Sequence, residues 1–443
     1  MLSNLIKSKI KINSIEFGQL SFYIGTLLLV TTNLIAGSFY LISLIISFKA
    51  KNNPLKKDLW NYLLLLSSIV FILGSIYIST TYDNNITYDV LKESSWEPIS
   101  VWLNLFNWLP LFLAFSGFQI YLKTENQRMQ FAKCLFFGLI PLLISIFLQK
   151  FGINGPFKFL NGLIVFYLYP IRGTAGYSGL FNNPNYTGLW LSASLPFCFA
   201  LLKSYRFQKI KLGFIFTIFF TTIYCIFQTN SRNASIGILV STYLMIGTKF
   251  LIFSLMCSIL LYFIVLAINP IFFSGSSIIE GFTLDRYFTK LLKTNYFNKI
   301  QFPRIDIWQK ASKLIMEKPL LGWGAATFPI LYIVRGGVEK SQHTHSMPLE
   351  IAHNHGIPAA LILMFFVSLL FIKGWRIIFN KNNHSQSEVN KAWITSLLII
   401  VITHISDLTY YDGRVSLLIW ILLAGVKCII DEYTIKNNLK NQN

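Results

Sequence analysis

Long runs of apolar residues recur along the chain and are separated by shorter polar segments. The runs fall at residues 18–48, 59–80, 101–121, 131–149, 186–203, 212–228, 233–247, 250–270, 347–373, 393–411 and 415–430. Most hold about 20 residues, enough for a helix to cross roughly 30 Å of membrane hydrocarbon. The pattern therefore predicts an all-α fold, a polytopic transmembrane helical bundle.

The first run is too long for one ordinary span. Lysines flank it on both sides, Lys11 before it and Lys49 after it among others, and the positive-inside rule places both flanks in the cytoplasm. We therefore interpret this run as two short segments joined by a tight turn near Thr31, Thr32 and Asn33. The prediction is then about 12 helical segments with both chain termini inside.

The charges of the loops agree with this orientation. Short basic loops at 123–133, 203–211 and 373–391 fall on the predicted cytoplasmic side, and the acidic loop at 81–100 falls outside. The loop at 271–346 also falls outside; it is basic, but loops longer than roughly 60 residues are exempt from the rule.

The same pattern divides the chain into four parts. They are N-terminal transmembrane helices at 1–270, a large extracytoplasmic loop carrying short helices at 271–346, C-terminal transmembrane helices at 347–430 and a cytoplasmic tail at 431–443. The N-terminus lacks a short apolar core followed by a small-residue cleavage site, so no cleaved signal peptide is expected.

Composition supports the membrane assignment. The chain is 54% hydrophobic and only 13% charged, whereas soluble domains carry roughly 25% charged residues. The net charge of +20 would suggest nucleic acid on a soluble protein, but here the basic residues lie mainly in loops between apolar runs and indicate topology. The five cysteines lie in apolar runs without metal-ligand spacing, so no disulfide framework is expected.

The polar stretch from Arg304 to Gly356 is the candidate working part of the chain. Four of its six histidines lie between His343 and His355. Histidine, with an unperturbed pKa of roughly 6.5, suits acid–base chemistry, although interfacial imidazoles bonded to backbone are an alternative. Zinc is a rival because His-x-His with His353 and Glu350 offers ligand types that zinc accepts, but no standard zinc-protease spacing occurs.

Four predicted helices begin at the outer surface with cap-like residues. The candidate caps are Asn183, Ser231 or Asn233, Ser346, and Asp412. Free N–H groups at helix N-termini favour anions, although such residues often serve only as caps.

Several arginines fall on this same side of the membrane. They are Arg172, Arg232, Arg304, Arg335 and Arg414. Arginine binds phosphate oxygens bidentately, so arginines grouped with helix N-termini would suit a pyrophosphate. Arginines at helix ends also snorkel to lipid headgroups, which is the alternative for Arg232 and Arg414. On a predicted helix at 304–318, Arg304 shares the apolar face with Trp308, as if the helix lay on the membrane surface with this charge turned inward.

Taken together, these stretches resemble the O-antigen ligase family of bacterial membrane proteins, whose relatives include O-antigen polymerases and proteins once described as bicarbonate transporters. The matching pieces are Gly179-Leu-Phe-Asn-Asn-Pro-Asn185, Ser231-Arg232, Arg304 with Trp308, Pro319-Leu-Leu-Gly-Trp-Gly324, and His343-Thr-His345 leading to Glu350 and Gly356. They occur in the family's order over about residues 170–425. One departure is Ser346, where the family usually has Asn.

The resemblance implies a GT-C-like glycosyltransferase without metal or other cofactor, facing the periplasm from the bacterial inner membrane. Its donor would be a saccharide on undecaprenyl pyrophosphate, and its acceptor a hydroxyl of lipid A-core, as in lipopolysaccharide, of another glycan in polysaccharide biosynthesis, or of a protein. Arg232 and Arg304 would hold the pyrophosphate, and His345 is favoured over His343 as general base. The further substrate-binding candidates are Arg172, Asn183, Asn185, Ser346, Glu350 and Arg414. Attack opposite the pyrophosphate would invert the anomeric configuration, and Trp323, Tyr410 and Tyr411 are candidates for stacking on sugar.

A transporter of an anion or a lipid-linked sugar is the alternative from another class, and a non-enzymatic scaffold is a third. Transporters tend to show inverted repeats and broken helices near the membrane midplane. This chain shows no visible repeat, and its polar residues gather at one face. The pattern therefore favours the enzyme.

Overall fold

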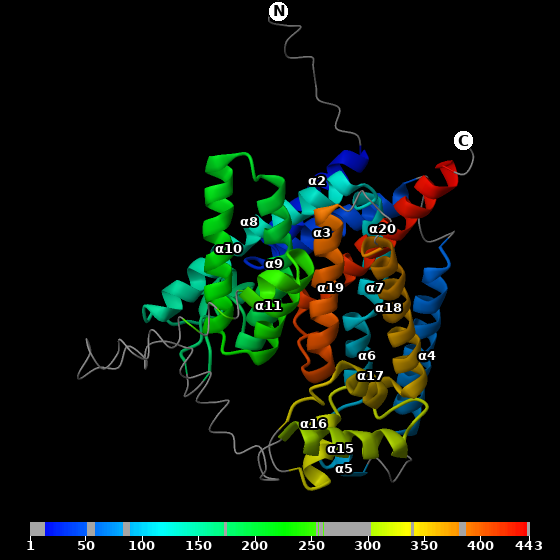
Figure 1. Cartoon of the computed structure of the whole chain (residues 1–443). Coiled ribbons are helices and arrows are strands. Elements are labelled where there is room, and N and C mark those ends of the chain that lie inside the picture. Colours follow the sequence, from blue (N-terminus) through cyan, green and yellow to red (C-terminus); the bar gives the residue numbers. More distant parts are fainter. Residues whose placement is uncertain are drawn as a thin grey trace, which may run out of the picture.

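The structure is a computed structural model that describes residues 14–50, 58–82, 89–171, 175–253, 303–337, 341–380 and 387–440, with 256 and 260 as isolated positions. These residues form sixteen α-helices, short 3-10 turns and one small hairpin (Figure 1). The α-helices are α2 Ser14–Leu28, α3 Asn33–Lys49, α4 Trp60–Thr81, α5 Asp89–Lys92, α6 Ile99–Asn104, α7 Leu109–Phe118, α8 Glu125–Lys150, α9 Pro184–Ser204, α10 Lys209–Gln228, α11 Arg232–Met245, α15 Pro303–Glu317, α16 Phe328–Val334, α17 Met347–His355, α18 Ile357–Ile378, α19 Glu388–Ser406 and α20 Gly413–Lys440. In the hairpin, β1 Phe157–Phe159 pairs antiparallel with β2 Ile164–Phe166, Lys158 lying opposite Val165.

Seven helical segments of the described chain are long and apolar enough to cross a membrane. They are Trp60–Thr81, Ile99–Tyr121, Glu125–Lys150, Lys209–Gln228, Ile357–Ile378, Glu388–Ser406 and Gly413–Leu439. The prediction of a polytopic helical membrane protein is therefore confirmed. The runs assigned to 186–203 and 233–247 coincide with α9 and α11. The run at 250–270 lies largely outside the described residues.

The first apolar run folds as two helices, as its length and flanking charges predicted. Helix α2 ends at Leu28 and α3 begins at Asn33, and the backbone N–H groups of Thr31 and Thr32 both donate to the Leu28 carbonyl. The two helices pack against each other, and the hydroxyl of Tyr40 in α3 donates to Thr26 Oγ1 in α2 at 3.0 Å in a buried position.

The run at 347–373 was expected to be one helix, and this is wrong: the chain breaks at Gly356, between α17 and α18. Gly356 has φ +87°, and a Cβ there would lie 2.0 Å from the carbonyl oxygen of Leu320. The 319–324 segment closes onto this break, with Ile357 N donating to Pro319 O and Trp323 N to His353 O, both at 2.7 Å. The break therefore exists because a second backbone occupies the space a side chain would need.

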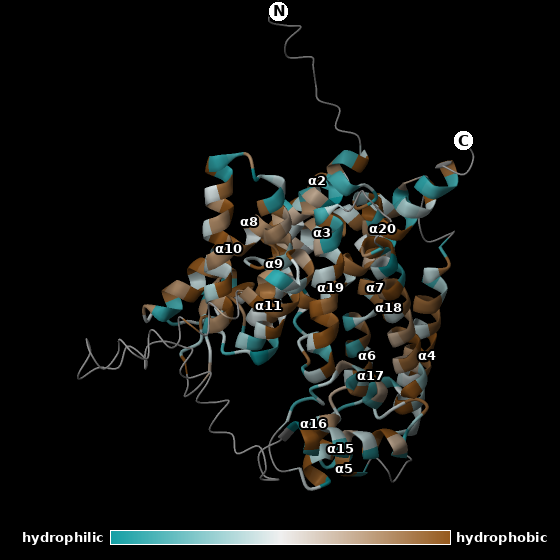
Figure 2. Ribbon diagram, viewed as in Figure 1, coloured by the Kyte–Doolittle hydropathy of each residue, from teal (hydrophilic) through white to brown (hydrophobic). Residues whose placement is uncertain are grey.

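Helices α5, α15 and α16 form a layer at one end of the molecule, opposite the end where α2 begins and α20 ends (Figure 1). Helix α15 lies at the predicted place, and its apolar face packs on protein. Its Ile307, Ala311 and Leu314 join a second hydrophobic core with Trp96 and Trp323, separate from the main core of the bundle. Figure 2 shows hydrophobic residues dominating α4 and α18, which stand beside this layer and run away from it.

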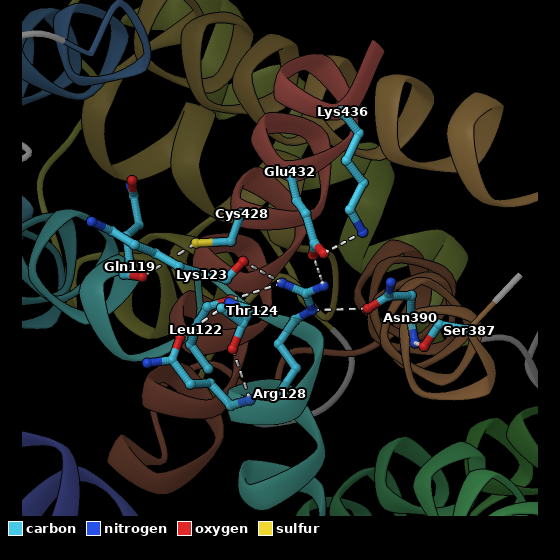
Figure 3. A network of polar contacts seen from close by, with 11 residues as sticks. Gln119, Leu122, Lys123, Thr124, Arg128, Ser387, Asn390, Cys428, Glu432 and Lys436 are labelled. Atoms are coloured by element: carbon cyan, nitrogen blue, oxygen red, sulfur yellow. Dashed lines mark hydrogen bonds and ion pairs between the residues drawn. The ribbon is translucent and has the colours of Figure 1, made fainter. Parts of the chain in front are cut away.

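At the opposite end, Arg128 of α8 joins three other parts of the chain (Figure 3). Its side chain is 0% exposed. Nε donates to Asn390 Oδ1 at 2.8 Å, Nη1 to the carbonyls of Leu122 and Lys123, and Nη2 to Glu432 Oε2 at 2.5 Å. Because each of its nitrogens has an acceptor, this arginine ties α8 to α19 and α20.

Candidate functional site

Polar side chains from distant parts of the chain line one cavity of about 140 Å³. The lining residues are Asn185, Asn230, Ser231, Arg232, Asn233, Arg304 and Asp407. They come from the starts of α9, α11 and α15 and from the residue that follows α19. Five residues named from the sequence thus line the same cavity: the substrate or catalytic candidates Asn185, Arg232 and Arg304, and the cap candidates Ser231 and Asn233.

Small residues bring the starts of α9 and α11 together. A Cβ on Gly188 of α9 would lie 2.8 Å from the Ala234 side chain of α11, so only glycine lets the two helices approach this closely. Asn183 caps α9 as expected, its side chain accepting from Asn185 N at 2.8 Å. Ser231 stands at the N-cap position of α11, but its side chain makes no capping hydrogen bond, contrary to prediction. The N–H groups at this helix start thus lack a side-chain cap.

Arg304 and Arg232 present cationic groups at this cavity. Arg304 Nη2 lies 3.9 Å from Asp407 Oδ2, and the arginine side chain remains 36% exposed. Arg232 is exposed, and its side chain makes no hydrogen bond or ion pair with any residue in the described ranges. An anion entering the cavity would therefore meet one loosely paired and one unpaired guanidinium.

Asp407 connects this cavity to the histidines. His345 Nδ1 lies 3.3 Å from Asp407 Oδ1, and the Asp407 side chain is only 5% exposed. Burial by itself raises the pKa of Asp407, but its hydrogen bond with His345 and the charge of Arg304 outweigh burial, so the pKa lies below its usual range. Asp407 is therefore a carboxylate at neutral pH, shared by an imidazole and a guanidinium.

The loop that carries His343 and His345 is tightly folded. His345 has φ +51°, a left-handed conformation that is uncommon for a residue with a side chain. The two rings meet edge to face with centroids 4.3 Å apart, and His345 N lies 3.4 Å from His343 Nδ1. Burial and the neighbouring His345 lower the pKa of His343 below its ordinary value, so this ring is neutral at pH 7.

Buried Glu350 joins this loop to neighbouring parts of the chain by hydrogen bonds. One of its oxygens accepts from Thr344 N at 3.0 Å, and the other accepts from Asn354 Nδ2 and from the hydroxyl of Tyr411, both at 3.2 Å. Glu350 was predicted to bind substrate, but its oxygens are used by the protein, which indicates that it positions the histidine loop. Ser346 begins α17 without a side-chain cap bond, again contrary to prediction.

Arg414 lies in the interior and is fully partnered. It is 3% exposed, pairs with both oxygens of Asp412, donates to the carbonyl of Leu180 at 3.1 Å and lies 3.7 Å from the centre of the Phe181 ring. Its guanidinium therefore has no pair of free N–H donors with which to bind a substrate, as its predicted role would need. Asp412 does cap α20, accepting from Arg414 N at 3.0 Å.

The remaining residues named from the sequence fall away from the cavity or outside the described ranges. Arg172 lies outside the described residues. Arg335 pairs with Glu317 at 2.7 Å, and Trp323 is buried in the second core, where it has no ring face free for a sugar. Tyr410 is also buried.

His353 and His355 are buried residues of α17 and do not line the polar cavity. Burial lowers the pKa of His353 to about 4, and burial together with His353 lowers that of His355 to about 3. His355 stacks on Phe71 with ring centroids 3.9 Å apart and contacts Asn104 at 3.0 Å. Across the described ranges, no three His, Cys, Asp or Glu side chains are placed to share a metal ion.

Asp407 and Asn230 are the lining residues that sequence reasoning missed. Asp407 lies inside the apolar run at 393–411, and an acidic residue in such a run is itself a signal of function. Asn230 precedes Ser231, the residue at the N-cap position of α11, and has φ +51°. No sequence pattern pointed to it.

A comparison with protein families found one match. A family model described as O-antigen ligase matches residues 217–364, which include Arg232, Arg304 and both histidines of the loop. No curated protein matches the chain. The candidate spans make the chain a multi-pass membrane protein, and its residues 217–364 are similar to the O-antigen ligase family.

Proposed function

We propose that this protein transfers a glycan from undecaprenyl pyrophosphate to an acceptor hydroxyl. The acceptor belongs to lipid A-core, another glycan or a protein, and the reaction inverts the anomeric configuration without a metal ion. The observation that carries the proposal is the meeting of Arg304, Asp407 and His345 beside Arg232, which has no partner among the residues that the structure describes. The family match supports it, since that domain implies glycosyl transfer.

The leaving group is a lipid pyrophosphate, which develops negative charge as the sugar–phosphate bond breaks. Arg232 and Arg304 bind this charge, and the free N–H groups at the start of α11 add to their field. Arg304 is held near the cavity by Asp407 at 3.9 Å, a distance that leaves its guanidinium able to turn toward phosphate oxygens. Asn185 lines the same cavity and completes the polar wall.

His345 is the general base in this proposal. In this proposal Nδ1–H of His345 donates a hydrogen bond to the carboxylate of Asp407, which leaves Nε2 free to take the proton of the incoming hydroxyl. The acceptor oxygen then bonds to the anomeric carbon as the bond to pyrophosphate breaks. The proton resides on His345, and undecaprenyl pyrophosphate leaves. His343, neutral and in contact with His345, supports the ring from its side.

The proposal also sets the orientation of the bundle. The site and the layer of α5, α15 and α16 face the periplasm, and both termini face the cytoplasm. Helices α2, α3, α9 and α11 join the seven candidate spans. Together with the apolar run predicted from the sequence at 250–270, they give about 12 segments of GT-C-like type. The four parts at 1–270, 271–346, 347–430 and 431–443 then alternate between membrane and aqueous surroundings.

Reconstitution with a lipid-linked oligosaccharide tests the function. Release of undecaprenyl pyrophosphate together with gain of glycan on an acceptor is the expected result, and it should persist in the presence of a chelator. If the wild-type protein instead moves the lipid across the bilayer and never cleaves the sugar–phosphate bond, the transporter is the better description. Labelling of a cysteine placed at Ser341 only after cell lysis would overturn the orientation.

A further inference from the structure

The small hairpin between α8 and α9 carries large apolar side chains on its surface. Its strands β1 and β2 are joined by the turn Leu160–Gly162, and Leu160 and Leu163 are 65% and 61% exposed. An isolated two-stranded hairpin is marginally stable at best in water. Contiguous apolar surface of this kind therefore indicates a contact with something outside the described chain.

The hairpin has two unlike faces. Cross-strand partners share a face, and side chains alternate between faces along each strand. Two cross-strand pairs lie on one face, Phe157 with Phe166 and Phe159 with Ile164. Lys158 stands on the other face and is exposed. Phe166 packs against the main core, whereas Phe157 and Phe159 remain 39% and 49% exposed. The exposed part of the hairpin is thus apolar on one side and basic on the other.

The exposed apolar surface of the hairpin continues that of a membrane span. Beyond its first turn, the exposed apolar residues of α8 are Phe137, Pro141, Ile144 and Leu148. They are spaced by three or four residues and so form one stripe along the helix. Because Glu125–Lys150 is a candidate membrane span, this stripe faces lipid. Phe151, three residues after Leu148 and 80% exposed, extends the stripe past the helix end toward the hairpin.

Hydrogen bonds tie the hairpin to the loop that leads to the polar cavity. Leu168, just after β2, donates from its backbone N–H to the carbonyl of Gly179 at 2.9 Å. The side chain of Gln149 joins the same two segments, donating to the carbonyl of Tyr169 and accepting from Gly179 N at 2.8 Å. Gly179 begins the segment that leads to Asn185 in the cavity wall. Hairpin and cavity therefore lie on the same side of the membrane, and the position of one constrains the other.

We propose that the hairpin inserts its exposed apolar side chains into the leaflet on the side of the site, at the boundary between headgroups and acyl chains. The bilayer is the occupant because the apolar surface is continuous with the lipid-facing stripe of α8. Exposed Lys150 and Lys158 supply the charge that complements lipid phosphates. Strands with open edges do not enter hydrocarbon, so insertion stops at this boundary.

Insertion has a consequence for the site. Through Gly179, the inserted hairpin holds the start of α9, and with it the polar cavity, at the height of the lipid phosphates. The lipid contact itself is independent of the proposed function, and only this consequence for transfer rests on it.

The first test measures the surroundings of the hairpin in a bilayer. The full-length protein, with its native cysteines replaced by alanine, carries a nitroxide on Leu163→Cys or on Lys158→Cys and is reconstituted in vesicles of phosphatidylethanolamine and phosphatidylglycerol. The label at 163 should collide mostly with oxygen, which concentrates in lipid, and the label at 158 mostly with a water-soluble nickel chelate. Equal surroundings at the two positions would overturn the proposal. Protection of the label at 163 from both reagents would also overturn it, because a second copy or the 250–270 segment would then cover the hairpin.

The second test removes the apolar turn. With Leu160→Asp and Leu163→Asp together, a nitroxide on Phe159→Cys should lose oxygen collisions and gain nickel collisions severalfold. Asn161→Asp is the matched control, since it adds a carboxylate to the same turn but keeps both leucines, and aspartate tolerates the φ of +54° there. In vesicles the double variant should raise KM for the lipid-linked donor severalfold and leave kcat nearly unchanged. Its thermal midpoint in detergent should stay near that of the wild type, because both leucines are exposed.

The outcomes separate the two proposals, because the nitroxide measurements need no glycan. The expected label surroundings without any glycosyl transfer by the wild type would keep the lipid contact and remove the enzyme. Normal transfer with a hairpin that is exposed to water or covered by protein would keep the enzyme and overturn the lipid contact. A double variant whose label leaves the lipid while KM stays unchanged would overturn the claim that insertion holds the cavity in place.

Discussion

Two arginine sites at opposite ends of the molecule show how differently the same side chain is used. Arg128 is 0% exposed and donates to Asn390, Glu432 and two backbone carbonyls. Arg304 is 36% exposed and has one carboxylate at 3.9 Å, and Arg232 has no partner among the described residues. The first arrangement is complete, whereas the second leaves donors for an anion that arrives from outside.

The difference separates a guanidinium whose donors are all used within the fold from guanidinium groups that have donors to spare. A guanidinium whose donors are all bonded cannot bind substrate without breaking the fold. A guanidinium with spare donors beside a buried carboxylate adds little to stability and is ready for a ligand. Substitutions at the two ends should therefore separate into two kinds.

The largest effect is expected at Arg128. Arg128→Ala leaves Asn390 and two carbonyls without their donor, and removal of one partner from a buried network costs about 3–5 kcal/mol of unfolding free energy. Thermal unfolding in detergent should show the loss, and the fraction that remains folded should transfer glycan at the normal rate. A folded Arg128→Ala protein that is stable but inactive would break the contrast between the two ends.

Arg304→Ala should have the reverse profile. Loss of one contact to the developing charge costs about 3 kcal/mol, roughly a hundredfold or more in rate. The thermal midpoint should stay near that of the wild type, because the side chain is only loosely paired. Arg304→Lys keeps the charge but not the bidentate fork, so it should retain part of the activity. Normal transfer by the alanine variant would remove Arg304 from the site.

Asp407→Asn sharpens the role of the pair with His345. The amide has the shape of the carboxylate but cannot stabilise a protonated imidazole, so transfer should slow about tenfold to a hundredfold, or about 1.4–2.7 kcal/mol. His345→Ala should slow transfer at least as much. The double variant should lose less activity than the product of the two single rate reductions, because both substitutions disable the same pair. Independent, multiplying losses would show that the two side chains do not act together.

Lowering the pH should destabilise the end of the molecule that holds the candidate site before it destabilises the end that holds Arg128. His353 and His355 bind protons near pH 6.5 when unfolded, but only near 4 and 3 in the fold. Between these pH values the unfolded state therefore binds more protons than the folded state. The contribution of the two neutral histidines to the free energy of unfolding is complete above pH 6.5 and is lost as pH falls, about 1–2 kcal/mol each by pH 5. Hydrogen exchange at pH 7 and pH 5 should show α17 losing protection while the start of α8 keeps it. Equal loss at both ends would contradict this.

Lys436→Ala should have the smallest effect. Lys436 pairs with Glu432 at 2.7 Å but is 65% exposed, so the pair is screened and its loss should cost under about 1 kcal/mol. The variant is a control for Arg128→Ala because both contact the same carboxylate. A loss as large as that of Arg128→Ala would show that Glu432, and not the buried arginine, organises this end.

Much of the site could be predicted because it is built from local signals. The cap at Asn183 and the helix that begins near Arg304 depend on residues that are close in the sequence, and both occur where they were predicted. Arg232 and Arg304 were both placed on the outer side by loop charge, and they line one cavity. The break at Gly356 was missed because it depends on contact with the 319–324 backbone and not on apolar periodicity.

The sequence by itself determined the class of this protein, because the length of an apolar run decides whether a helix can cross a membrane. It did not reveal which arginines are free. Glu432 lies 304 residues from Arg128, and Asp407 lies 62 residues from His345. Asp412 pairs with Arg414 from two residues away in the chain. Contacts with Leu180 and Phe181, which are distant in the sequence, bury that arginine and use its remaining donors. Electrostatic pairing and burial depend on distance in space. The tertiary structure alone therefore decided that, among the residues it describes, Arg128 and Arg414 use their donors within the fold while Arg304 and Arg232 keep donors free.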